Sequence, residues 1–144
     1  MPIRFRSIAV LCALAAWGCS GAAKPAPAAS ATPAALAVAS IDVGRSLAAD
    51  KTIADKTDTF APTDTFYVAV RTTGSSPSAA LVARWTFGEQ VVTEATQAIA
   101  PSGPAVTEFH VSKPAGDAGW PKGDYKVEII LNGTSAGTKS FKVQ

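Results

Sequence analysis

From residue 64 to residue 143 the sequence alternates apolar and polar residues with a period of two. Such alternation predicts antiparallel β-strands that bury one face and expose the other. It is clearest in five segments, residues 64–72, 79–87, 105–112, 124–132 and 139–143. Two more strands are expected at 40–43 and 90–99, the second without a clear buried face. Clusters rich in Gly and Pro separate these segments, which predicts an all-β antiparallel sandwich of seven or eight strands.

Residues 1–18 have the layout of a secretory signal peptide, because Arg4 and Arg6 precede an apolar run too short to span a bilayer as a helix. The last residues before Cys19, Leu-Ala-Ala-Trp-Gly, resemble the lipobox of bacterial lipoproteins. The resemblance implies cleavage before Cys19 and its acylation, with chains such as palmitate. Plain secretion after ordinary cleavage and an uncleaved segment are the alternatives.

The cysteine count agrees with a lipid anchor at Cys19. The chain has two cysteines, and Cys12 would leave with the signal peptide. Cys19 would then have no disulfide partner, and acylation accounts for the lone thiol. Several acyl chains on one residue suffice for a stable membrane anchor. In the lipoprotein family an Asp after the cysteine often marks inner-membrane retention, so Ser20 implies the outer membrane where the source has two membranes.

Residues 19–37 are rich in Ala and Pro and carry almost no charge. Such a segment buries too little apolar surface to offset its ordering entropy, so it is expected to be a disordered, extended tether. An Ala-rich helix is the competing interpretation, but the prolines disfavour it. Residues 38–144 then form a single domain, a length that suits one core.

The run WPKGDYKV, residues 120–127, resembles the end of bacterial immunoglobulin-like domains, together with LNG at 131–133 and FKV at 141–143. Upstream, FAPTDTFYVAV at 60–70 resembles their second-strand region. The resemblance implies an immunoglobulin-like, fibronectin type III-like β-sandwich without the inter-sheet disulfide of antibody domains. It also implies a tyrosine corner at Tyr125. It specifies a fold and little about function.

The residues give little support for catalysis, and no enzyme activity or cofactor is expected. The single histidine, His110, falls on the predicted outer face of a strand beside Glu108, and any Ser-His-Asp triad would have to include it. Paired carboxylates, as in glycosidases, are conceivable but equally suit exposed strand faces. Their candidates are Asp64, Glu94, Glu108 and Glu128.

The charge balance and the spacing of candidate metal ligands argue against nucleic-acid binding and against metal binding. Without Arg4 and Arg6 the chain has 11 basic and 11 acidic residues, so no basic field would recruit nucleic acid. Oxygen ligands of the kind that calcium favours are close in sequence between residues 50 and 64. They are Asp50, Asp55, Asp58 and Asp64. Lysines interleave with them and the spacing is not that of an EF-hand, so no metal site is expected, with calcium left open.

Four apolar residues are predicted to lie on outer faces, and they form a binding patch if several share one sheet. They are Tyr67, Val82, Val106 and Ile130. The alternative is that the strand registers are off by one residue. Trp85 is expected in the core. Trp120 is expected to cover the end of the core, and the alternative is an exposed ring that stacks on sugars.

The sequence therefore predicts a lipid-anchored envelope lipoprotein that presents a non-enzymatic immunoglobulin-like binding or accessory module. Its partner would be another envelope protein, contacted through a sheet face or an edge strand. One alternative is a carbohydrate- or peptidoglycan-binding module that uses Trp120. A further alternative is a small hydrolase around His110. The sequence leaves the partner's identity, the oligomeric state and the membrane face open.

Overall fold

The computed structural model describes residues 34–113 and 116–144. The chain divides into two units, Met1–Ala31 and Thr32–Gln144, and all described residues belong to the second. The predicted signal peptide, Cys19 and most of the Ala/Pro tether lie outside the described residues. Within the described residues, no helix has the length and apolar character needed to cross a bilayer.

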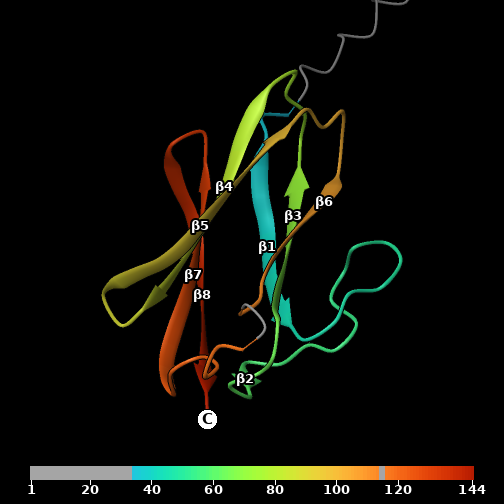
Figure 1. Cartoon of the computed structure of the whole chain (residues 1–144). Helices are drawn as coiled ribbons and strands as arrows, with labels where there is room; N and C mark the ends of the chain where they lie inside the picture. The colour runs from blue at the N-terminus through green and yellow to red at the C-terminus, as the bar shows by residue number, and fades with distance from the viewer. Residues whose placement is uncertain (1–33, 114–115) are drawn as a thin grey trace, which may run out of the picture. The chain divides into compact units, whose positions relative to one another are not determined.

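In this described part of the chain, eight strands form two sheets (Figure 1). The strands are β1 (Ala37–Gly44), β2 (Thr59–Phe60), β3 (Phe66–Thr73), β4 (Ala79–Phe87), β5 (Gln90–Ile99), β6 (Ala105–Val111), β7 (Gly123–Leu131) and β8 (Thr134–Val143). The first sheet has the order β1-β3-β6 and the second the order β2-β8-β7-β4-β5. Among the pairs of named strands in the described residues, β2–β8 alone is parallel. This arrangement confirms the predicted immunoglobulin-like β-sandwich.

The core lies between the two sheets and follows the predicted alternation. Phe66, Val68 and Val70 of β3 face it from one sheet, and Leu81 and Trp85 of β4 face it from the other. Because successive side chains of a strand point to opposite faces, Arg71 of β3 and Val82 and Arg84 of β4 lie on the outer faces. The burial of Trp85 confirms its expected place in the core.

Strand β5 is the exception to this alternation. Seven of its ten residues are exposed, none is fully buried, and only Ala95 and Ile99 pack against the edge of the core. A bulge where β5 passes Trp85 and Thr86 of β4 further breaks the alternation. The sequence of β5 therefore carried no clear signal for a buried face, although its range was predicted correctly.

The short strand β2 is an element that the sequence pattern missed. Phe60 is only 1% exposed, and β2 pairs with the end of β8 through two backbone hydrogen bonds. Lys142 N donates to Asp58 O at 2.7 Å, and Gln144 N donates to Phe60 O at 3.0 Å. Two residues are too few to show a period, so the alternation of apolar and polar residues did not predict β2.

The turns at the end of the chain agree with the expectations from the sequence. Asn132 and Gly133 have φ angles of 50° and 82°, and they form the two-residue turn between β7 and β8. The Asn132 side chain also accepts a hydrogen bond from Ala80 N at 2.9 Å. The Tyr125 hydroxyl donates to Pro121 O at 2.9 Å, which confirms the tyrosine corner.

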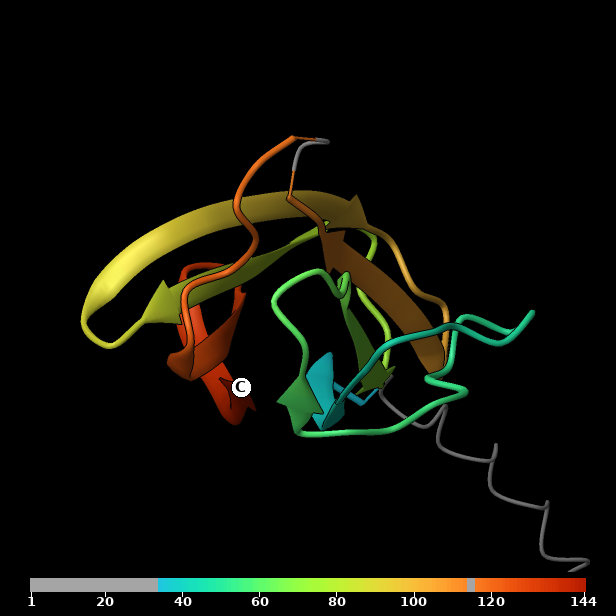
Figure 2. The same ribbon diagram turned by 60° about the horizontal axis from the view of Figure 1, so that its bottom comes forward.

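The two long sides of the sandwich differ. On one side β8 approaches β1 so closely that a Cβ added at Gly137 would lie 2.8 Å from Ile41 Cδ1. On the other side β5 and β6 are the edge strands of their sheets. Figure 2 shows β5 lying along the outside of β4 as a long curved strand. One side is therefore closed by packing, whereas the other ends in two sheet edges.

Candidate binding surfaces

Trp120 lies in an aromatic cluster at the end of the sandwich that holds the C-terminus. It is 5% exposed, its ring stacks on Phe66 at a centroid distance of 4.7 Å, and its Nε1 donates to Asp64 O at 2.9 Å. Lys113 Nζ lies 5.1 Å from the Trp120 ring centroid, within cation–π range. Trp120 thus covers the core, and the alternative of an exposed, sugar-stacking ring does not fit its burial.

The four outer-face apolar residues divide equally between the two sheets. Tyr67 and Val106 lie on β3 and β6, whereas Val82 and Ile130 are cross-strand neighbours on β4 and β7. Ile130 is only 8% exposed. These residues are therefore separated by the thickness of the sandwich and do not form the single patch considered from the sequence.

His110 stands on the outer face of β6 with its side chain exposed. Its Nδ1 lies 3.3 Å from Glu108 Oε2, and its ring centroid lies 5.6 Å from that of Tyr67. In the described part of the chain, no serine or threonine hydroxyl hydrogen-bonds to His110. The hydrolase hypothesis thus has an acidic and an aromatic neighbour for its base, but no nucleophile in contact with it.

Asp50 and Asp64, two of the four aspartates considered as calcium ligands, bind different neighbouring residues. Asp50 accepts hydrogen bonds from Thr52 Oγ1 at 2.6 Å and Thr52 N at 3.1 Å, and these bonds lower the pKa of Asp50. Asp64 accepts from Ala61 N at 2.8 Å and pairs with Arg45 at 3.2 Å. Across residues 34–113 and 116–144, no three His, Cys, Asp or Glu side chains are grouped to hold a metal ion.

A three-residue ion-pair network crosses the outer face of the five-stranded sheet. The Arg84 guanidinium lies between Glu94 on β5, at 2.8 Å, and Glu128 on β7, at 3.3 Å. The hydrogen bond and charge of Glu94 raise the pKa of Arg84, and Glu128 adds to the effect. Two of the four candidate catalytic carboxylates therefore share one guanidinium as ion-pair partners.

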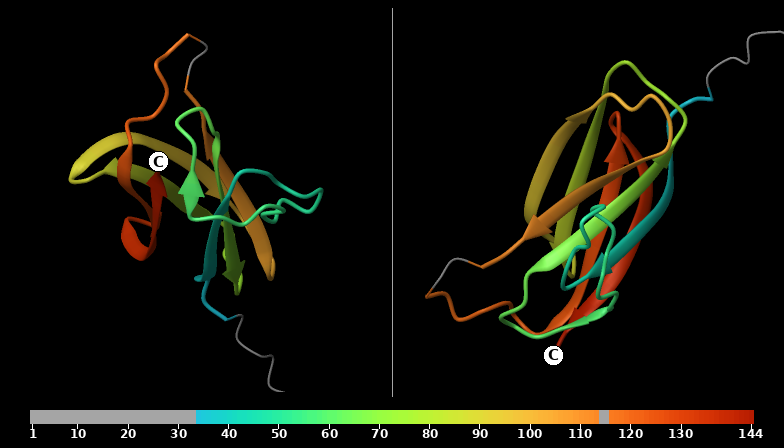
Figure 3. Two further views of the ribbon diagram at one scale, coloured as in Figure 1. Left: turned by 90° about the horizontal axis from the view of Figure 1, so that it is seen from below. Right: turned by 90° about the vertical axis from the view of Figure 1, so that its right-hand side faces the viewer.

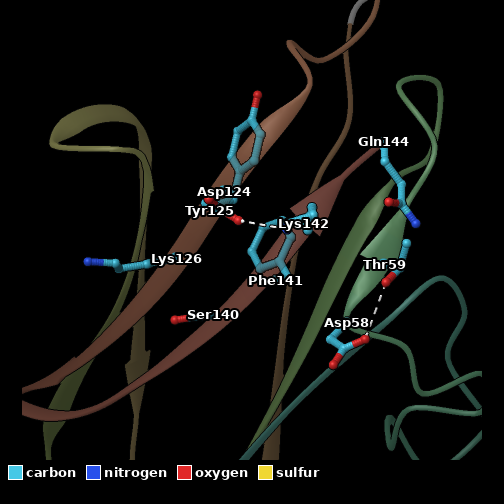
Figure 4. A pocket seen from close by; sticks show the side chains of 9 residues that line it. All are labelled: Asp58, Thr59, Asp124, Tyr125, Lys126, Ser140, Phe141, Lys142 and Gln144. Carbon is cyan, nitrogen blue, oxygen red and sulfur yellow. Dashed lines mark hydrogen bonds and ion pairs between the residues drawn. The ribbon is translucent and has the colours of Figure 1, made fainter.

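An open hollow of about 620 Å³ lies where β2, β7 and β8 meet near the C-terminus (Figure 4). It is lined by Asp58, Thr59, Asp124, Tyr125, Lys126, Ser140, Phe141, Lys142 and Gln144. Lys142 Nζ lies 3.6 Å from Asp124 Oδ1. Charged side chains of both signs therefore surround the hollow, which suits a polar chain segment better than a small apolar ligand.

Comparisons with known proteins identify the fold class. No protein family and no curated protein matches the chain. An immunoglobulin-like protein from Pseudomonas aeruginosa superposes with a TM-score of 0.53 at 14% identity, over 78% of this chain and 98% of that one. Identity this low establishes the fold alone, so the described domain is an immunoglobulin-like β-sandwich.

Two enzymes contain a similar sandwich. A cycloisomaltooligosaccharide glucanotransferase from Paenibacillus sp., complexed with cycloisomaltoheptaose, matches with a TM-score of 0.53 at 18% identity over 75% of this chain. An alkylpurine DNA glycosylase from Pseudomonas fluorescens, bound to DNA with an abasic site analog, matches with a TM-score of 0.50 at 10% identity over 76%. This chain covers only 14% of the first enzyme and 30% of the second.

Proposed function

We propose that this protein is an envelope lipoprotein, anchored through Cys19, that presents a non-enzymatic immunoglobulin-like module to another envelope protein. The lipobox-like sequence before Cys19 and the lone thiol support the anchor. The proposed location is the outer membrane where the source has two membranes. The match to an immunoglobulin-like protein over 98% of that protein's length supports a sandwich that acts as a module in its own right.

The observation that carries the proposal is the placement of the chain entry and the polar hollow at opposite ends of the sandwich. Ser75 N donates to Ala34 O at 3.0 Å, and Ala35 bridges to Ser75, which fixes the first described residues beside the β3–β4 connection. Gln144 lines the hollow, and the right-hand view of Figure 3 shows the C-terminus at the end of the sandwich opposite the start of β1. The chain therefore enters the sandwich at the end opposite the hollow, so a tether that continues from Ala34 would leave the hollow accessible to a partner.

The chemistry of the hollow favours a polar protein segment as the ligand. Asp58 and Asp124 can accept hydrogen bonds, whereas Lys126 and Lys142 can donate them. Positive and negative side chains of a partner could therefore both form ion pairs here. These side chains are largely exposed, as in the wet rim of a transient interface. The proposed partner is therefore another envelope protein, held by hydrogen bonds and exposed ion pairs.

The intact mass of the protein extracted from its native membrane tests the anchor. The expected mass is that of residues 19–144 plus acyl chains, and Cys19→Ser should release the chain from the membrane fraction. A mass without lipid would refute the anchor and leave a freely diffusing protein.

Filling the hollow tests the binding surface. Ser140→Arg places a long side chain in the hollow, whereas Thr138→Arg places the same side chain on the same face of β8 outside it. We expect cross-links to the envelope partner to be lost in the first variant and kept in the second. Equal cross-linking in both variants would exclude the hollow as the contact.

A further inference from the structure

The β5 edge of the five-stranded sheet has no partner among the described residues. β5 pairs only with β4, although at ten residues it is as long as any strand in the domain. An edge strand offers a row of backbone donors and acceptors to any chain that can align with it. The backbone N–H and C=O groups along the β5 edge are therefore positioned to pair with a further strand.

The two sheet edges on this side are protected to different degrees. β6 carries Glu108 and His110 on its outer face, and its Glu108 carbonyl oxygen already accepts a hydrogen bond from Gln97 Nε2 at 2.6 Å. β5 contains no Lys or Pro, and its one charge, on Glu94, is held by Arg84 at 2.8 Å. Neither β5 nor β6 contains the Lys or Pro residues that commonly prevent edge pairing, so the two edges differ mainly in the exposed apolar side chains that β5 carries.

β5 also carries the only large apolar side chains that are exposed in the described part of the chain. Val91 is 59% exposed and Val92 is 40% exposed. The bulge explains why two consecutive residues both face outward, because Thr93 faces Trp85 in the interior while Val91 pairs with the outward Thr86. Apolar side chains that lie beside an open sheet edge mark a site of association.

We propose that two copies of this chain associate through antiparallel pairing of their β5 strands, with the two-fold axis at Ala95. In this register Glu94 lies opposite Thr96 of the second copy, and Thr93 lies opposite Gln97. Beyond the bulge, Val91 and Val92 approach Ala98 and Ile99 of the second copy. The strand is thus complementary to itself, and an apolar contact forms at each end of the ladder.

Charge disfavours the neighbouring register of the paired strands, which would be centred on Glu94. Pairing centred on Glu94 would place two carboxylates opposite each other, which is unfavourable. Pairing centred on Ala95 sets the single carboxylate of each strand against a threonine hydroxyl. One strand-to-strand contact buries less surface than a standard interface of about 1,200–2,000 Å², so the dimer is expected to be weak and transient.

Sedimentation of the full chain over a range of concentrations, in mild detergent where the chain carries lipid, tests the proposal. We expect a dimer fraction that rises with concentration. Val92→Lys should weaken association at least tenfold, because a lysine on an edge strand opposes pairing. Val106→Lys is the matched control, since it places the same charge on the edge strand β6 and should leave association unchanged.

Hydrogen exchange gives an independent readout on the same samples. Backbone amides of residues 90–99 should exchange more slowly at high than at low concentration, whereas those of β6 should not change. A monomer at every concentration would overturn the proposal. Loss of the dimer in Val106→Lys but not in Val92→Lys would also overturn it and assign the contact to β6. Neither result bears on lipid anchoring at Cys19.

Discussion

The aromatic end of the sandwich and β5 are held in place by different interactions. Around Phe66, the rings of Phe60, Trp120, Tyr125 and Phe141 lie with centroid distances of 4.7 to 5.7 Å. β5 belongs to the same fold but contributes only Ala95 and Ile99 to the margin of the core, and its position depends mainly on the backbone ladder with β4.

This difference implies an uneven distribution of stability. Burial of apolar surface stabilises by about 25 cal/mol per Å², and nearly all of it lies away from β5. Strands with few buried side chains open locally at lower free energy than the global unfolding. The part of the domain that is easiest to open is therefore the part with the free edge and the exposed valines.

The largest expected effect is that of Phe66→Ala. Loss of this buried ring removes four aromatic contacts and leaves a cavity, so the free energy of unfolding should fall by about 3–5 kcal/mol. Urea denaturation measures it. Val91→Ala on β5 is the comparison variant and should change stability by no more than about 0.5 kcal/mol. Similar losses in both variants would contradict the contrast between the two regions.

Tyr125→Phe sharpens the comparison within the aromatic end. The variant keeps the ring but removes the hydroxyl that donates to Pro121 O at 2.9 Å. We expect a loss of about 1–2 kcal/mol in the free energy of unfolding, since a partly buried carbonyl loses its partner. An unchanged urea midpoint would show that packing alone, without the tyrosine corner, holds this end.

The same tyrosine predicts a pH effect. Burial raises the pKa of Tyr125 above its ordinary value of 10.0, so the folded state retains the phenol proton longer than the unfolded state does. Stability should be constant below about pH 10 and fall as the pH rises above it. Urea midpoints between pH 8 and pH 11 measure the decline, and a decline just as steep in Tyr125→Phe would assign it to other groups.

The smallest expected effect concerns the ion pair on β5. Glu94→Gln removes the charge that faces Arg84, but both side chains are exposed, at 42% and 37%. Exposed pairs of this kind contribute little and are screened by salt. The urea midpoint should stay within error of the wild type at moderate salt. A loss close to that of Phe66→Ala would show that β5 anchors the fold after all.

The sequence was sufficient to predict the strands whose side chains alternate between core and solvent. The limits of β4 were predicted to the residue, because Leu81, Ala83 and Trp85 all face the core. The sequence was insufficient to predict β2, because two residues are too few to show a period. It was also insufficient for the buried face of β5, where a bulge and wide exposure leave no amphipathic pattern.

The candidate binding surfaces were much less predictable. In the hollow, the β7–β8 hairpin pairs Asp124 with Lys142, and the parallel contact of β2 with β8 brings Asp58, which lies far away in the chain, beside them. The row of Glu94, Arg84 and Glu128 likewise depends on strand register. The placement of Trp120 over the core was expected from its position in the loop before the last hairpin, but its hydrogen bonds to Pro62 O and Asp64 O were not.

The placement of Ala34 and Gln144 at opposite ends of the sandwich has a mechanical consequence. A pull exerted between a tether at Ala34 and a partner at the far end would act along the strands. Backbone hydrogen bonds between antiparallel strands run perpendicular to that direction, so many bonds of a ladder bear the load together. Such shear loading resists force better than peeling, which breaks the bonds one after another. If the chain is tethered at Ala34 as proposed, the domain would therefore resist unfolding when tension acts between its two ends.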